Sequence, residues 1–282
     1  MKNQIVFLAA CVLLSGRQLI AQCSDAGVCS IGHETTSPGP RVSVDYQFGR
    51  SSRTDDLTFH SVVVSADIPV FTDSRLYASI PYSRQSGPLG SASGIGDMTL
   101  IWTQRLLGDA ASRLGIQMGG KIALADVNTN GLPQAYQSGL GTHDGLFGVT
   151  YDVLEWNFAL AYQLSRGRSS NSVNRLRRCD DLLLRAGYRH EFTSVTLGGE
   201  VLAIKRLAQS SVLTSGSGQP EAFGDLSNSD QTQINVLVRG SYALSETVDL
   251  KGMAAIPLLK RDVNVDGLTR SVSLSLGLSL LL

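Results

Sequence analysis

The chain has 282 residues, and its 24 lysine and arginine residues balance 24 aspartate and glutamate residues. That length suits one large domain, and zero net charge gives no sign of a nucleic-acid partner or of a strongly ion-selective pore. The 29 glycines favour a turn-rich all-β protein over a helical one.

Residues 1–21 are typical of a secretory signal peptide. Lys2 precedes ten uninterrupted apolar residues, Ile5 to Leu14, and we expect cleavage after Ala21. The apolar run is far shorter than the roughly 20 residues of a membrane-spanning helix. A lipoprotein site at Cys11 is the alternative, but little hydrophobic sequence precedes it. Since no second long apolar run follows, insertion into a membrane would have to use strands.

Residues 22–40 lack periodicity and are predicted to form a short periplasmic arm. Cys23 and Cys29 are candidates for a disulfide, because an exported chain folds in an oxidising compartment. Cys23, Cys29 and His33 are alternatively weak candidates for metal ligands, because three ligands at uneven spacing are little evidence. We expect no cofactor.

From Val42 onward, apolar residues alternate with polar or small ones, which predicts strands. About twelve are expected, at 42–48, 57–70, 76–85, 94–107, 113–125, 145–151, 156–165, 182–192, 195–207, 231–244, 247–260 and 271–282. The second strand shifts its apolar side partway, which suggests a bulge.

The last twelve residues, Ser271 to Leu282, carry the clearest pattern. Apolar side chains occupy every even position from Val272, and serine or glycine occupies the odd positions through Ser279. A soluble protein seldom ends on such an unguarded edge. In a membrane barrel the last strand pairs with the first, the apolar face meets lipid and the small polar face meets the lumen.

The connections alternate in length along the chain. Long ones start near Arg50, Ser86, Asp126, Arg166, Ala208 and Arg261, and short ones near Phe71, Gly108, Asp152, Thr193 and Ser245. A soluble sandwich has no reason to sort its loops in this way. We therefore predict a transmembrane antiparallel up-and-down β-barrel over residues 41–282, monomeric and in the bacterial outer membrane, with both termini in the periplasm.

The segment Gly94-Ile95-Gly96-Asp97-Met98-Thr99-Leu100 resembles the glycine-x-glycine-aspartate-apolar-x-apolar segment of the outer-membrane barrel family named for the meta pathway of phenol degradation. The likeness extends loosely over the mature chain. Membership would imply a channel for small, hydrophobic or aromatic compounds. Leu282 departs from the family, whose barrels usually end on an aromatic residue.

Strand parity directs a set of charged side chains toward the lumen, since such charges are costly on a lipid-facing surface. These lumen-lining candidates are Asp45, Arg105, Lys121, Arg185, Arg189, Glu191, Glu200, Arg239, Asp249 and Lys251. They either neutralise one another in a nearly closed barrel or line a polar conduit, and parity does not distinguish these alternatives.

The sequence favours a passive pore or uptake channel for a small-molecule solute. An enzyme is not expected, because none of the four histidines has a nearby serine-asparagine arrangement. The alternative is a structural or adhesive barrel whose loops do the recognition. Expected partners are outer-membrane lipid, lipopolysaccharide and the barrel assembly machinery, and the arginines between Arg166 and Arg178 would suit lipopolysaccharide phosphates.

Overall fold

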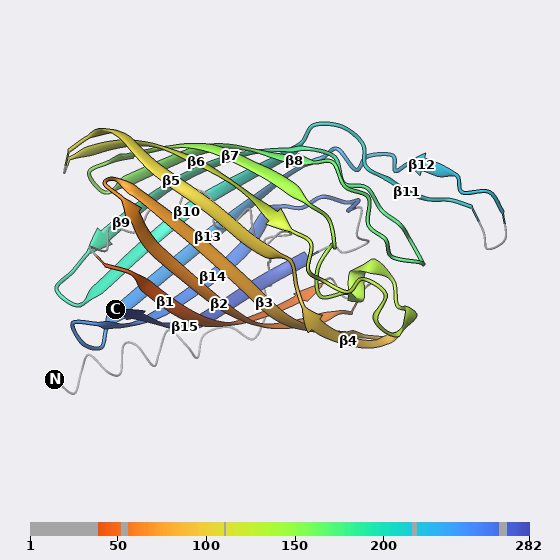
Figure 1. Cartoon of the computed structure of the whole chain (residues 1–282), viewed down its shortest axis with the longest axis horizontal. Helices are drawn as coiled ribbons and strands as arrows, with labels where there is room; N and C mark the ends of the chain where they lie inside the picture. Colours follow the sequence, from red (N-terminus) through yellow and green to blue (C-terminus); the bar gives the residue numbers. More distant parts are fainter. Residues whose placement is uncertain (1–38, 52–55, 110, 216–218, 265–269) are drawn as a thin grey trace.

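A computed structural model describes residues 39–51, 56–109, 111–215, 219–264 and 270–282. The predictions for the signal peptide and for Cys23, Cys29 and His33 lie outside these ranges. The described chain is a closed antiparallel β-barrel (Figure 1). Within it, no helix is long and apolar enough to cross a membrane.

Twelve strands form the barrel wall, which confirms the predicted fold class and strand number. They are β1 (Arg41–Ser51), β2 (Thr58–Phe71), β3 (Ser74–Gly87), β5 (Met98–Gly108), β6 (Ser112–Ile122), β7 (Asp144–Val153), β8 (Trp156–Ser165), β9 (Asp181–Glu191), β10 (Val195–Arg206), β13 (Thr232–Ala243), β14 (Val248–Leu259) and β15 (Arg270–Leu281).

The last strand closes the barrel against the first, as its pattern predicts. Arg41 pairs with Leu281, and the register continues without interruption to Arg50 opposite Val272. At the end of the chain, the backbone N–H of Leu282 donates to the carbonyl oxygen of Pro40 at 2.9 Å. Because β1 and β15 satisfy each other's backbone groups, no free edge remains at this seam.

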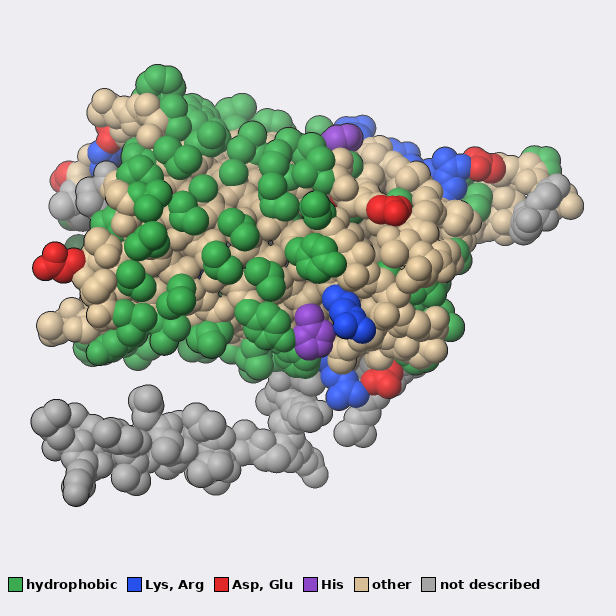
Figure 2. Space-filling view, turned by 60° about the horizontal axis from the view of Figure 1, so that its bottom comes forward, with side chains coloured by type: hydrophobic (Ala, Val, Ile, Leu, Met, Phe, Trp, Pro, Cys, Tyr) green, Lys and Arg blue, Asp and Glu red, His purple; other side chains and the backbone are tan. Residues whose placement is uncertain are grey.

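The two faces of the wall differ in polarity. On β15, Leu274, Leu276, Leu278 and Leu280 are exposed on the outside, whereas Ser279 is buried. Hydrophobic side chains form a broad band over the outer surface (Figure 2). Such a band is the surface that a bilayer covers.

One predicted strand is interrupted. The segment predicted at 94–107 is divided between β4 (Gly90–Ile95), which pairs with the distal half of β3, and β5. At the break, the backbone N–H of Gly96 donates to the carbonyl oxygen of Pro81 at 2.8 Å. This bond turns the chain from β4 into β5.

The second strand has no bulge where its apolar side shifts. β2 pairs with β1 in continuous register from Thr58 to Asp67, and its register with β3 is interrupted only near its end, between Pro69 and Phe71. The apparent shift arises because Phe59 and Val63 are apolar residues on the inner face. The predicted loop after β10 also differs, since it contains a small hairpin of β11 (Ser211–Leu213) and β12 (Phe223–Asp225).

Long and short connections alternate around the barrel as predicted. The short turns lie at one end of the barrel together with Pro40 and Leu282, and this end is called here the short-turn end. The longer connections lie at the other, called the long-loop end. The loop between β6 and β7 contains two short 3-10 helices, η1 (Thr129–Gly131) and η2 (Gln134–Tyr136).

Candidate functional site: the barrel lumen

A cavity of about 790 Å³ lies inside the barrel. Its lining includes Asp73 and Arg113 at the short-turn end and Gln134 and Leu140 of the β6–β7 loop at the other. All twelve strands of the wall contribute to its lining, and β1, β2, β3, β5 and β6 contribute about half of it. The cavity therefore extends between the two ends of the barrel, mainly on the side of these five strands.

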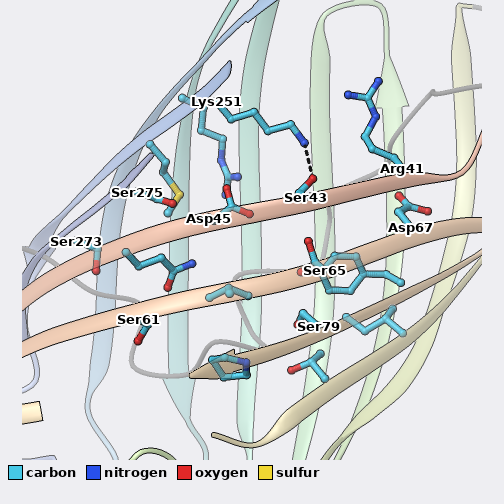
Figure 3. A pocket seen from close by; sticks show the side chains of 18 of the residues that line it. Arg41, Ser43, Asp45, Ser61, Ser65, Asp67, Ser79, Lys251, Ser273 and Ser275 are labelled. Carbon is cyan, nitrogen blue, oxygen red and sulfur yellow. Dashed lines mark hydrogen bonds between the residues drawn. The ribbon is translucent and has the colours of Figure 1, made fainter. Parts of the chain in front are cut away.

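Serine side chains form much of that wall. Ser43, Ser61, Ser65 and Ser79 project from β1, β2 and β3 toward the cavity (Figure 3). Several bond across strands, as Ser61 does with Ser83 at 2.7 Å between the two hydroxyl oxygens. These serine side chains are small, polar and uncharged, so each can replace a hydrogen bond to water by one to a solute at little cost in free energy.

The ten charged residues predicted by parity occupy three kinds of position. Seven line the cavity: Asp45, Arg105, Lys121, Arg189, Glu200, Arg239 and Lys251. Arg185 is only 2% exposed and pairs with Glu200. Asp249 pairs with Arg41. Glu191 is exposed and pairs with Arg189. Their role in transport stays a prediction.

The charges along the cavity occur mostly as ion pairs. Glu200 lies between Arg239 and Arg185, with shortest nitrogen–oxygen distances of 2.9 and 3.7 Å. Asp67 pairs with Arg75 at 2.7 Å. The Nζ of Lys251 donates to the hydroxyl oxygen of Ser43 at 3.4 Å (Figure 3). Pairing offsets the desolvation of these groups, and leaves a cavity with charges of both signs.

Sequence reasoning missed seven further charged residues of the lining: Arg41, Asp67, Asp73, Arg75, Asp97, Arg113 and Asp152. Arg113 shares the parity of Lys121 on β6, so the rule that found Lys121 identifies it as well. Arg41 and Arg75 precede the predicted starts of their strands by one residue. Asp67 was obscured by the expected bulge.

The opposite half of the lumen is filled. Leu146, Leu183, Leu202, Ile204 and Leu237 are at most 2% exposed and belong to one buried cluster inside β7, β9, β10 and β13. Burying each such side chain contributes about 1.5–3 kcal/mol. Where this layer lies, it narrows the lumen toward the side of β1–β6.

A buried charge network lies at the long-loop end of this filled half. Asp181 accepts two hydrogen bonds from Arg206, both at 3.1 Å, and pairs with Arg261 at 3.4 Å. Arg178 pairs with Asp144 at 2.8 Å. Arg178 thus points inward, unlike exposed Arg166 at the start of the same loop. The predicted arginine cluster is therefore divided between the interior and the surface.

The β6–β7 loop contacts the cavity through residues held by Asp97. One carboxylate oxygen of Asp97 accepts the N–H groups of Leu140 and Gly141 at 2.9 and 3.0 Å, and the other those of Leu124 and Ala125 at 3.3 Å each. Asp97 is 5% exposed. The glycine-x-glycine-aspartate segment thus fixes both ends of a loop that lines the cavity.

Other side chains brace the same loop. Gln134 donates to the carbonyl oxygen of Gly139 at 2.7 Å, and Gln137 to that of Leu132 at 2.8 Å. Asn171, in the β8–β9 loop, donates to the same Leu132 oxygen at 2.9 Å. These hydrogen bonds join the β6–β7 loop to itself and to the β8–β9 loop. They therefore hold in place the part of the cavity lining at the long-loop end.

No protein-family model and no curated protein match the chain. Its fold is similar to three solved barrels. The COG4313 outer membrane channel from Pseudomonas putida F1 is 14% identical, with a TM-score of 0.69 over 90% of this chain and 98% of that one. The NanC porin is 12% identical, with a TM-score of 0.52 over 85% and 100%.

The CymD monoaromatic hydrocarbon channel is 9% identical, with a TM-score of 0.52 over 86% of this chain and 88% of that one. All three comparisons cover most of both chains. The chain therefore has the fold of a twelve-stranded barrel of the kind found in outer-membrane channels.

Proposed function

We propose that this chain is an outer-membrane channel for the passive passage or uptake of small solutes, including hydrophobic or aromatic ones. The observation that carries the proposal is the cavity, whose lining extends from Asp73 and Arg113 at one end of the barrel to Gln134 and Leu140 at the other. A barrel that served only as a membrane anchor would need no such passage.

The cavity lining supports the solute class. Phe59, Val63, Ile101, Ala135 and Leu140 interrupt the serine-rich surface with apolar contacts. A small molecule with an apolar body and a polar substituent can use both kinds of surface. The fold likeness to a monoaromatic hydrocarbon channel supports the same solute class. The segment Gly94 to Leu100, which resembles the meta-pathway barrel family, supports it as well.

Single-channel conductance of the folded mature chain in a planar bilayer tests the proposal. Steady current that an added monoaromatic solute blocks in a concentration-dependent manner is the expected result, because the solute would occupy the narrow passage beside the filled half. A correctly folded barrel that carries no current and releases no trapped solute from vesicles would contradict it.

The orientation is a separate part of the proposal. We expect the long-loop end to face the outside, as it does in outer-membrane barrels. A membrane-impermeant reagent on intact cells should reach cysteines placed in the loop at 208–230, whereas cysteines at the 108–112 turn should react only after lysis. The reverse pattern would invert the barrel.

One observation favours a second candidate, a barrel that recognises partners through its loops. The β11–β12 hairpin projects well beyond the barrel rim (Figure 1). At its base the guanidinium of Arg168 lies 3.7 Å from the centroid of the Phe223 ring. Deleting the hairpin would abolish adhesion but leave conductance unchanged if recognition were its role.

A further inference from the structure

The outer surface of β1–β3 changes character near the long-loop end. The strand register aligns Phe48, His60 and Arg84 in one row across the three strands, with Tyr46, Val62 and Tyr82 in the row below. Arg50 lies one row further from the middle of the barrel, opposite Thr58. Apolar and aromatic side chains therefore give way to basic ones within a few residues.

This change falls where the apolar band ends. On β2 the outward residues from His60 to Val70 span ten residues, which at about 3.3 Å each and a tilt of about 40° is a height of about 25 Å, the height of the lipid-facing band of an outer-membrane barrel. Tyr82 is 54% and Tyr46 47% exposed, as in an aromatic girdle. Blue and purple side chains border the green band in Figure 2.

The basic side chains at this end of the apolar band have hydrogen-bond donors that the protein does not use. The Arg84 side chain is exposed and makes no ion pair or hydrogen bond with the residues that the structure describes. His60 contacts the Tyr46 hydroxyl through Nδ1 at 2.7 Å, so a tautomer that accepts this bond presents Nε2–H as a donor. Arg50 pairs with Asp56 at 2.7 Å and is partly neutralised.

We propose that Arg84 and His60, with the adjoining Tyr82, bind a phosphate group of a phosphorylated glycolipid of the outer leaflet, of the lipid A class. This inference rests on the proposed outer-membrane location and names a lipid contact at a site separate from the lumen. A guanidinium binds phosphate through paired hydrogen bonds. Exposed Val62, Val64 and Ile80 continue below the row and would contact the acyl chains, which free phosphate lacks.

Native mass spectrometry of the folded barrel provides the test. The wild-type barrel and an Arg84→Gln/His60→Gln variant are incubated with bisphosphorylated lipid A or with its dephosphorylated form. We expect the wild type to retain the bisphosphorylated lipid at least five-fold more than the variant, and both proteins to retain the dephosphorylated lipid equally and weakly. Orthophosphate at the same concentration should not displace the bound lipid.

The matched control is Lys205→Gln/Lys260→Gln, which removes two exposed basic residues at the same end of the barrel, one on β10 and one directly after β14. It should retain lipid A as the wild type does. The proposal would be overturned if both double variants lost lipid A retention equally, or if the Arg84→Gln/His60→Gln variant retained as much lipid A as the wild type. Displacement of the bound lipid by orthophosphate would overturn it as well. Conductance of the Arg84 variant should equal that of the wild type, so failure of the lipid site and failure of the channel are distinguishable.

Discussion

The carboxylate of Asp97 accepts the backbone N–H of Leu140 at 2.9 Å, although 43 residues separate them in the chain. Asp97 lies at the break between β4 and β5, and Leu140 lies in the loop that contributes to the cavity lining. A single buried carboxylate thus joins the barrel wall to the loop. The shape of the cavity at this end depends on that connection.

Replacing Asp97 with asparagine should release the β6–β7 loop. The amide has one acceptor oxygen, so the NH₂ group would face two backbone N–H donors, and leaving them unsatisfied costs about 1–3 kcal/mol each. We expect a lower urea midpoint for unfolding in lipid vesicles and more frequent current fluctuations in single-channel records.

Asp126→Asn is the matched control for this loop. Asp126 is exposed and accepts only the N–H of Asn128, at 2.9 Å, among the contacts that the structure shows. Its replacement should leave both measurements unchanged. A quiet, wild-type current from Asp97→Asn would show that the carboxylate does not restrain the loop.

Gly119→Ala should weaken the contact between β5 and β6. A Cβ atom at Gly119 would lie 2.1 Å from the carbonyl oxygen of Leu100, so the two strands would have to separate. We expect a loss of about 1–3 kcal/mol in unfolding free energy, measured by urea titration. Gly199→Ala is the control, because its Cβ would meet no described atom within 4 Å; equal stability of the two variants would contradict the steric argument.

The barrel wall was predictable because the period of a strand is two. In β15 every leucine from Leu274 to Leu280 lies outside and Ser279 inside, as alternation alone requires. The same rule directed Lys251 and Arg185 inward. The rule could not show that Lys251 lines a cavity whereas Arg185 is buried. This difference in exposure depends on residues of other strands, such as Leu202 and Leu237, that fill one half of the lumen.

Loop residues were beyond the reach of periodicity. Arg178 and Arg261 belong to no strand, yet both lie inside the barrel in the network around Asp181. The Asp97 contacts were equally hidden, because the segment was expected to continue as one strand. In each case the position of the side chain is set by tertiary contacts, which a local pattern does not encode.

Glu200→Gln should shift the ion preference of the channel toward anions. Glu200 lines the cavity between Arg239 and Arg185, and removing its charge leaves an excess of positive charge there. We expect the anion-to-cation permeability ratio, from reversal potentials in a potassium chloride gradient, to rise about twofold or more. Glutamine has nearly the size of glutamate and keeps an acceptor oxygen beside Arg239, so folding should survive.

The control is Glu191→Gln, which makes the same chemical change at an exposed carboxylate that is not part of the cavity lining. Its reversal potential should equal that of the wild type. Equal shifts in both variants would mean that ions sense the overall charge of the barrel and not the charge beside the filled half.

Ser65→Phe should obstruct the passage, whereas Val64→Phe, one residue earlier, should not. Ser65 faces the cavity opposite Ser79 (Figure 3), and Val64 is 51% exposed on the outer surface. A phenyl ring at position 65 would fill part of a passage already narrowed by the packed layer, and we expect conductance to fall by about half or more. A ring at position 64 would meet lipid, where aromatic side chains are tolerated. Both variants should fold, as judged by heat-dependent mobility on gels. If conductance were the same in both, the current would not pass along the wall formed by β1, β2 and β3, and the cavity would have to be a closed binding site.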